Sequence, residues 1–190
     1  MKRTVWKFGL YAGGVMSVLM LASLPFEKVI GYDLALVVGY TSMVLAFLFI
    51  FFGVRSYRDA IGRGAIGFGR ALAVGSLIAV IASVCYTATW EVIYYWIAPD
   101  FAARYEALEV DRVKASGASQ AEIDKRVADL KHFTELYKNP AVNIAYTLIE
   151  PLPVGLAIAL VTAGVLRRRP ADDVDSSVDA SGAAMPAGSR

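Results

Sequence analysis

The feature that most constrains the fold is a long apolar stretch between residues 68 and 98. From Ala71 to Cys85 the only polar side chains are those of Ser76 and Ser83. A helix rises about 1.5 Å per residue, so about 20 residues cross a hydrocarbon core of about 30 Å. The stretch ends in an aromatic band that holds a carboxylate, Trp90-Glu91-Val92-Ile93-Tyr94-Tyr95-Trp96. This pattern predicts a membrane-spanning helix with its aromatic end at a membrane surface.

Three further stretches share this length and apolar character. The sequence therefore predicts an all-α fold, a bundle of four transmembrane helices with an extramembrane helical hairpin between helices 3 and 4. The expected helices cover about residues 6–26, 34–54, 68–98 and 141–166, and the outer hairpin covers 99–138. The chain is 57% hydrophobic with a mean hydropathy of +0.51, too apolar for an ordinary soluble domain. We expect residues 1–169 to form one membrane domain and residues 170–190, rich in Ala, Ser, Gly and Asp, to form a disordered cytoplasmic tail.

Basic side chains indicate how the bundle is oriented. Those that flank the helices with few acids beside them lie in the N-terminal segment Met1–Lys7, in the Arg55–Arg70 loop and in Arg167–Arg169, whereas the seven Lys or Arg of 99–138 are offset by eight acids. Because successive helices cross the membrane in alternate directions, these three segments fall on one side. The positive-inside rule makes that side cytoplasmic. Both termini are then expected inside and the hairpin outside.

The first apolar stretch has two interpretations. A basic start and the small residues Ala22-Ser23 are features of a cleavable signal peptide. The length of the run, with Gly9 and Gly13 in G-x-x-x-G spacing, is more typical of a membrane helix that packs closely on a neighbour. We expect the helix to be retained, and cleavage would leave the later helices in the same orientation.

The loop after the second helix contains a literal G-x-G-x-x-G, from Gly62 to Gly67. A dinucleotide site needs a buried strand before this motif and a later acid for the ribose. Here membrane helices lie on both sides, and no acid follows before Glu91. We therefore interpret the glycines as a tight turn back into the bilayer.

Charged residues dominate the segment 99–138, and its helix signals predict the hairpin. Pro99 can open a first helix and Gly117 can end it. Ser119-Gln-Ala-Glu122 has the capping-box pattern that opens a second helix, and Asn139-Pro140 marks a break. Its apolar side is expected to rest on the partner helix or on the membrane surface.

Small or polar residues recur every fourth position along the third and fourth apolar stretches. They are Ala71, Gly75, Ala79, Ser83, Thr87 and Glu91 in the third, and Asn143, Thr147, Pro151, Gly155, Ala159 and Ala163 in the fourth. Small side chains let helix backbones approach closely in lipid, so we expect both stripes to be packing faces.

Two carboxylates lie well inside the apolar stretches. Counted along straight helices, Glu150 is about 15 Å from the outer end of its helix and Glu91 about 10 Å. Buried anions in lipid cost roughly 2.5–3.5 kcal/mol, and no Lys or Arg shares this depth. Each acid must be neutral, hydrogen-bonded or wetted by a cavity. The candidate partners are Asn143, Tyr146, Thr147, Thr87 and Tyr94.

These residues suggest a ligand site. We hypothesise a polar pocket, open to the outside, that takes protons or a small cationic ligand. Its residues are Glu91, Glu150, Asn143, Thr147 and Tyr94. Pro151 and Pro153 support this, because prolines free backbone carbonyls as in ion-binding helices. The competing interpretation is a structural hydrogen-bonded network that holds the helices in register.

Other chemistry finds little support in the sequence. Cys85 is the one cysteine and His132 the one histidine, so no metal-ligand spacing exists. No H-E-x-x-H motif and no serine–base pair is present. No run of basic residues is interleaved with stacking aromatics. We expect no catalytic residues, no metal or other cofactor, and no binding to nucleic acid.

Several stretches resemble a family of small bacterial integral membrane proteins known as domain of unknown function 4199. The matching residues are Phe51–Asp59, Ile66–Leu72, Trp90–Tyr95, Pro99–Phe101, Ala118–Ser119, Tyr137–Pro140 and Glu150–Gly155. The resemblance covers about residues 1–169. It implies a multi-pass protein of the bacterial inner membrane and agrees with the four-helix layout, and it brings no activity or site residue.

Two functional classes remain in view. The first is a non-enzymatic accessory or scaffold protein of the inner membrane, in contact with the lipid bilayer, that binds a membrane-protein partner through the outer hairpin. The alternative is a small oligomeric transporter or ligand-binding membrane protein that uses Glu91 and Glu150. Because transporters usually have more helices or repeats, this alternative needs a homo-oligomer, assembled through stripes such as Gly9–Gly13.

Overall fold

The computed structural model describes residues 1–26 and 32–167, and the secondary-structure elements in that part of the chain are all helical. In chain order they are α1 (Lys2–Ser23), η1 (Leu24–Phe26), α3 (Tyr32–Ala60), α4 (Phe68–Val92), η2 (Ile93–Ile97), α5 (Phe101–Ala115), α6 (Gln120–Tyr137), α7 (Pro140–Ile149) and α8 (Pro151–Leu166). The all-α prediction is confirmed for these residues. Most of the turn after the first helix and the expected disordered tail, 170–190, lie outside them.

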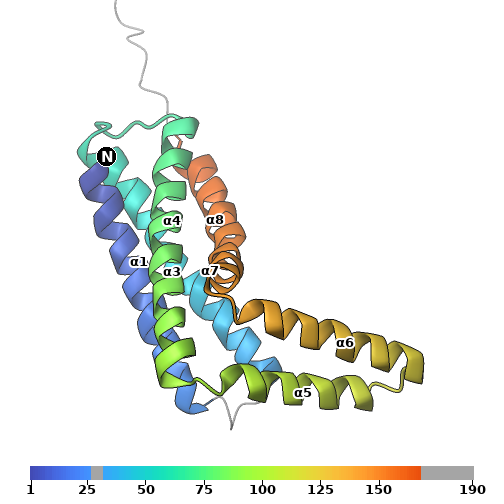
Figure 1. The fold of residues 1–190 in the computed structure, drawn as a ribbon. Coiled ribbons are helices and arrows are strands. Elements are labelled where there is room, and N and C mark those ends of the chain that lie inside the picture. Colours follow the sequence, from blue (N-terminus) through green and yellow to red (C-terminus); the bar gives the residue numbers. More distant parts are fainter. Residues whose placement is uncertain (27–31, 168–190) are drawn as a thin grey trace, which may run out of the picture.

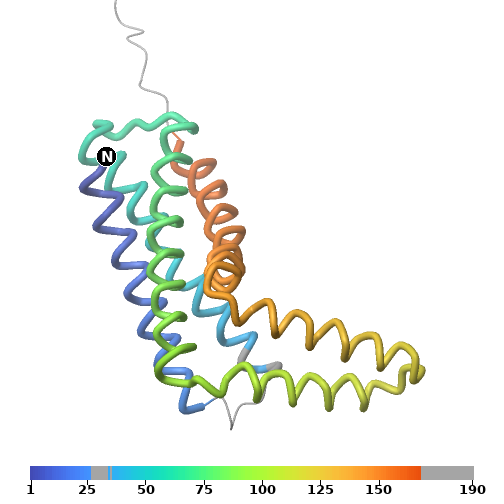
Figure 2. The backbone as a smooth tube through the Cα atoms, viewed as in Figure 1, coloured from blue at the N-terminus to red at the C-terminus, as the bar shows by residue number. Residues whose placement is uncertain are grey.

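In the part of the chain that the structure describes, four segments are long and apolar enough to cross a membrane: Lys2–Phe26, Leu36–Ala60, Phe68–Ile97 and Pro140–Leu166. They match the four apolar stretches of the sequence. The N-terminus, the loop at 61–67 and the end of α8 lie together at one end of the bundle (Figure 1). The other end carries α5 and α6, which lie alongside each other and extend sideways from the bundle (Figures 1 and 2).

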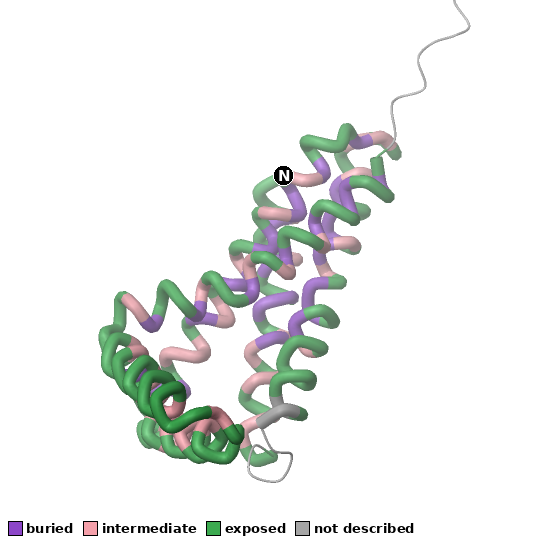
Figure 3. Tube along the Cα trace, turned by 90° about the vertical axis from the view of Figure 1, so that its right-hand side faces the viewer, coloured by how far each residue is buried: buried purple, intermediate pink, exposed green. Residues whose placement is uncertain are grey.

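Helix α4 is the centre of the bundle and packs against α1, α3, α7 and α8. Its small-residue stripe is buried as the spacing predicts, from Ala71 through Gly75, Ala79 and Ser83 to Thr87. The matching stripe of the fourth span, from Asn143 to Ala163, is buried as well. Figure 3 shows buried residues where the bundle helices face one another, whereas α5 and α6 are mainly exposed.

Glycines mark the closest helix approaches. A Cβ at Gly155 of α8 would lie 2.8 Å from the Cβ of Ala79 on α4, and one at Gly75 would lie 2.9 Å from the Cβ of Ala159. On α1, added Cβ atoms at Gly9 and Gly13 would collide with Ile81 and Cys85 of α4. The Gly9–Gly13 stripe therefore packs inside one chain and is not free to join two copies. That part of the oligomer hypothesis is wrong.

The turns follow the sequence signals. Gly64, in the loop between α3 and α4, has φ of +86°, and Gly117, between α5 and α6, has φ of +72°, both in the left-handed region that favours glycine. Ser119 caps α6, because its Oγ accepts a hydrogen bond from the backbone N–H of Glu122 at 3.4 Å. The tight-turn interpretation of the glycine-rich loop is confirmed, and so is the Ser119 half of the capping box, whereas the Glu122 side chain pairs with Arg126.

The fourth span is broken at Glu150, as its prolines predicted. Pro151 and Pro153 have no backbone N–H, so the carbonyls of Thr147 and Ile149 lose their helical donors. Figure 1 shows α7 almost end-on, while α8 runs along the bundle. Counting the depth of Glu150 along one straight helix is therefore wrong, because α7 does not continue the axis of α8.

Candidate functional site

A cavity of about 1320 Å³ lies between the α5–α6 hairpin and the neighbouring end of the bundle. Its walls come from α1, α3, α4, α5, α6 and α7, so it exists only because the hairpin folds beside the bundle. Apolar side chains such as Met16, Leu36 and Leu108 supply much of the wall. Small-molecule sites have this concave and mainly apolar character, with a few polar groups for orientation.

Aromatic side chains form a large part of the cavity wall. They are Tyr40, Tyr86, Trp90, Tyr94, Phe101, Tyr105, Phe133, Tyr137 and Tyr146. Three helices contribute rings at spacing four, which places them on one face of each helix: Tyr86, Trp90 and Tyr94 on α4 and η2, Phe101 and Tyr105 on α5, and Phe133 and Tyr137 on α6. Trp90 meets Phe101 edge to face at 4.9 Å, which ties α4 to α5.

Glu150 is the acidic group of the cavity on the bundle side. The Tyr86 hydroxyl of α4 donates a hydrogen bond to Glu150 Oε2 at 3.2 Å. The Glu150 side chain is exposed, and the space beside it is the cavity. Within the described part of the chain it has no ion-pair partner. The break before Pro151 places this carboxylate where helix α7 meets α8, at the edge of the cavity.

A second polar group lies beside it on α7. Thr147 Oγ1 donates to Asn143 Oδ1 at 3.2 Å, and Tyr137 Oη lies 3.0 Å from Thr147 Oγ1. A threonine hydroxyl has one proton, so Tyr137 is the donor to Thr147. Asn143 is fully buried, and its amide nitrogen has no partner among the described residues. Burial raises the pKa of Tyr137, and the negative charge of Glu150 acts in the same direction.

Glu91, unlike Glu150, lies outside the wall of the cavity. It lies on α4 two residues before the π-helical segment η2, is partly buried, and has an enclosed Oε1 without a hydrogen-bond partner among the described residues. It does not line the cavity that Glu150 lines. The two glutamates are therefore not brought together in this cavity.

Of the five residues predicted for the pocket, the structure brings Glu150, Thr147 and Tyr94 to the wall of one cavity. Asn143 lies behind Thr147 and is hydrogen-bonded to it, and Glu91 lies elsewhere. The sequence reasoning missed Tyr86, the hydrogen-bond partner of Glu150. The signal that could have found it is the spacing of Tyr86, Trp90 and Tyr94, which continues the aromatic band back along the face of α4.

The described residues also give no indication of a metal site. No group of three or more His, Cys, Asp or Glu side chains in residues 1–26 and 32–167 is placed to hold a metal ion. His132 is exposed on α6, as the sequence predicted.

Within the described residues, four helices are long and apolar enough to span a bilayer, as in helical membrane proteins, and an aromatic-lined cavity lies beside them. Residues 7–168 match the family described as "Protein of unknown function (DUF4199)", and the chain belongs to that family. The resemblance noted in the sequence is thereby confirmed. No curated protein and no solved structure matches the chain.

Proposed function

We propose that the protein is a non-enzymatic, multi-pass protein of the bacterial inner membrane that binds an apolar or amphipathic small molecule in the cavity beside the hairpin. The observation that carries the proposal is the cavity itself. At about 1320 Å³ it exceeds the roughly 300–1,000 Å³ of most small-molecule sites, and its walls are aromatic and apolar around a few polar groups.

The position of the cavity suits a ligand that arrives from outside or from the outer leaflet. Basic residues at the end that holds the N-terminus favour a cytoplasmic location for that end. Helix α8 has 16 residues from Pro151 to Leu166, about 24 Å of rise. Glu150 then lies near the outer boundary of a hydrocarbon core of about 30 Å, and the hairpin lies outside it.

The non-enzymatic part of the proposal rests on the residue types available. One histidine and one cysteine, with no catalytic spacing around either, supply no recognisable nucleophile–base pair. The polar groups around the cavity can bind and orient a ligand. Tyr86, Glu150, Thr147 and Tyr137 are arranged as hydrogen-bond donors and acceptors.

The test is photolabelling of the full chain in nanodiscs with a neutral aliphatic diazirine. We expect the probe to label peptides that carry Trp90 and Tyr94 more strongly than the exposed face of α8. Gly39 lines the cavity, and a Cβ there meets no atom within 4 Å. Gly39→Trp places an indole ring in the cavity and is expected to reduce labelling of those peptides about twofold or more.

Gly164→Trp is the matched control. Gly164 also has no atom within 4 Å of an added Cβ, but it does not line the cavity. We expect this variant to label like the wild type. Labelling of Trp90 and Tyr94 no stronger than that of Val161 and Val165 on α8, or equal effects of the two tryptophans, would show that the cavity is not a binding site.

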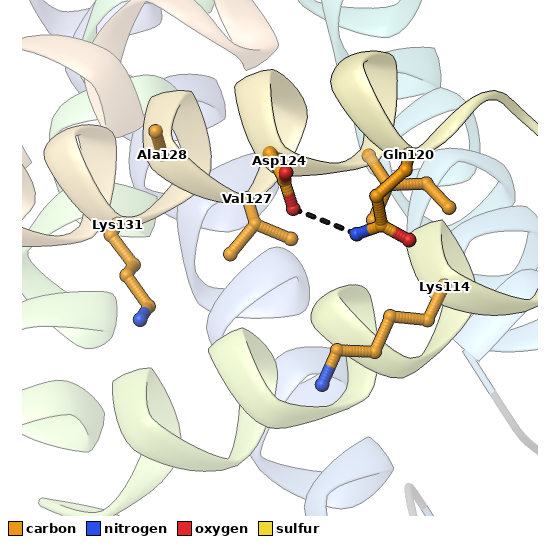
Figure 4. A pocket seen from close by; sticks show the side chains of 7 residues that line it. Lys114, Gln120, Asp124, Val127, Ala128 and Lys131 are labelled. Carbon is orange, nitrogen blue, oxygen red and sulfur yellow. Dashed lines mark hydrogen bonds between the residues drawn. The ribbon is translucent and has the colours of Figure 1, made fainter.

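A second function, partner binding by an accessory or scaffold protein, is favoured by a groove on the hairpin. The groove has a volume of about 510 Å³, with Val127 in its wall and Lys114 and Lys131 at its sides (Figure 4). Gln120 Nε2 donates to Asp124 Oδ1 at 2.9 Å along its edge. This apolar strip between two cations can receive an acidic, amphipathic segment of another membrane protein.

Cross-linking tests this second function. A photoreactive benzoylphenylalanine at position 127 is expected to give one discrete protein adduct in native membranes. The same group at position 165, on the exposed side of α8, is the control and is expected to give none, since Val165 is 68% exposed and faces away from the bundle. No adduct from position 127 would remove the scaffold function and leave the cavity function in place.

A further inference from the structure

We infer that the ligand of the cavity is a lipophilic organic cation, a single positive charge carried on an aromatic or alkyl body. The positive charge lies beside Glu150, and the body lies among the aromatic rings of α4, α5 and α6. This inference rests on the proposed function of the cavity as a binding site, and it adds the chemical class of the ligand.

The first argument is the balance of charge in the cavity wall. The cationic residues among its described lining, Arg104 and Arg112, are paired with carboxylates outside the wall: Arg104 Nε lies 3.0 Å from Asp100 Oδ2, and Arg112 Nη1 lies 3.4 Å from Glu109 Oε1. The two carboxylates of the wall, Glu150 and Asp111, have no ion-pair partner in the described part of the chain. Among the described residues of the wall, the charged groups left without an opposite charge are therefore both carboxylates.

The second argument is the aromatic content. The faces of aromatic rings attract cations, most strongly for tryptophan, and clustered rings recognise quaternary ammonium groups. Trp90, Tyr94 and Tyr137 form one connected group, with Trp90 and Tyr94 centroids 6.0 Å apart and Tyr94 and Tyr137 centroids 5.7 Å apart. Tyr146, on the same helix as Glu150 and four residues before it, extends this group towards the carboxylate.

The third argument is that the cavity wall is less suited to an anionic or a neutral ligand. An anionic amphiphile would meet Glu150 and Asp111, and both arginines of the wall are already paired. Like charges at close range are repulsive, and the repulsion grows as water is excluded. A neutral ligand would fill the apolar part but leave Glu150 with Tyr86 as its one hydrogen-bond partner among the described residues. A cation with an apolar body satisfies both parts of the wall.

Two ions of nearly equal size and shape test the inference. We would measure the binding of tetraphenylphosphonium and of tetraphenylborate to the full chain in dodecyl maltoside, subtracting partition into empty micelles. The wild type is expected to bind the phosphonium at least about tenfold more tightly than the borate, a difference of about 1.4 kcal/mol. Glu150→Gln keeps the shape and the acceptor for Tyr86, and is expected to remove most of that preference.

Glu91→Gln is the matched control, since Glu91 lies outside the cavity wall. It is expected to leave both affinities unchanged. Borate binding by Glu150→Gln shows whether the cavity still forms in that variant. Equal wild-type affinities for the two ions, or an unchanged preference in Glu150→Gln, would overturn the cation inference.

The outcome also separates this inference from the proposed function. If the neutral diazirine labels the cavity but the two ions bind equally, only the choice of a cation fails. If neither ion binds and the diazirine does not label the cavity, the proposed function fails with it. Adding phosphatidylethanolamine, whose zwitterionic head group carries a primary ammonium beside its phosphate, distinguishes two sources: displacement of the phosphonium assigns the site to a lipid head group, and no displacement assigns it to a free organic cation.

Discussion

The substitution Gly155→Leu is expected to lower the free energy of unfolding by about 3 kcal/mol, because the interface of α4 and α8 has no room for a side chain there. A Cβ at Gly155 would lie 2.8 Å from Ala79 Cβ and 2.9 Å from Phe47 Cζ. Neither neighbour can yield easily, since Ala79 and Phe47 are both fully buried. The larger side chain forces α8 away from the bundle and loses the close backbone approach on which packing in lipid depends.

The measurement is an unfolding titration of the purified protein from mild detergent into dodecyl sulfate, followed by circular dichroism and tryptophan fluorescence. Gly164→Leu is the control, on the same helix with the same change in helix propensity. No atom lies within 4 Å of an added Cβ at Gly164, so its effect is expected to stay within about 0.5 kcal/mol of the wild type. Similar effects of both leucines would mean that α8 does not pack on α4 through Gly155.

The four helices and their packing faces could be predicted from the sequence because both depend on local patterns. Apolar length alone identifies the spans, and the spacing of small residues identifies which sides meet. Gly75 with Ala79 and Gly155 with Ala159 form such a pair of stripes, and the structure packs them against each other. In lipid the smallest side chains mark the contact, since apolarity does not distinguish the inside of a bundle from its outside.

The choice of partner for each stripe could not be predicted in the same way. Gly9 and Gly13 have the spacing of a dimer interface, but they contact Ile81 and Cys85 of the same chain. A stripe of small residues indicates that another helix packs closely on it. It does not indicate whether that helix belongs to the same chain. That information comes from the turns and from the arrangement of all four helices.

The sequence predicted residues on the bundle side of the candidate site, but not the side that the hairpin forms. Glu150, Thr147 and Tyr94 lie on faces that point towards other helices, so the helical period identifies them. The wall opposite them comes from α5 and α6, whose position depends on the π-helical end of α4 and on the bend at Glu150. Sequence spacing gives neither of these directions, so a straight-helix count grouped Glu91 with Glu150 and left Tyr86 out.

Alanine at position 47 is expected to lower the free energy of unfolding by about 2–3 kcal/mol. Phe47 is fully buried on α3 at the point where α3 meets α8. In a soluble core the loss would be about 3–5 kcal/mol, part of it from returning apolar surface to water. Here the unfolded helices stay in an apolar medium. The loss of stability therefore comes mainly from the van der Waals contacts that the removed phenyl ring made with its neighbours.

Phe52→Ala is the control for this second change, in the same helix but with a side chain that is 51% exposed. This control is expected to lower the free energy of unfolding by less than about 1 kcal/mol. The double variant Phe47→Ala/Gly155→Leu gives the sharper measurement, because the space left by the phenyl ring lies beside the added leucine. We expect the double variant to be more stable than the sum of the single effects by about 1 kcal/mol or more, the coupling found for residues in contact. Simple additivity would show that Phe47 does not limit the approach of α8, leaving Ala79 as the side chain that requires glycine at position 155.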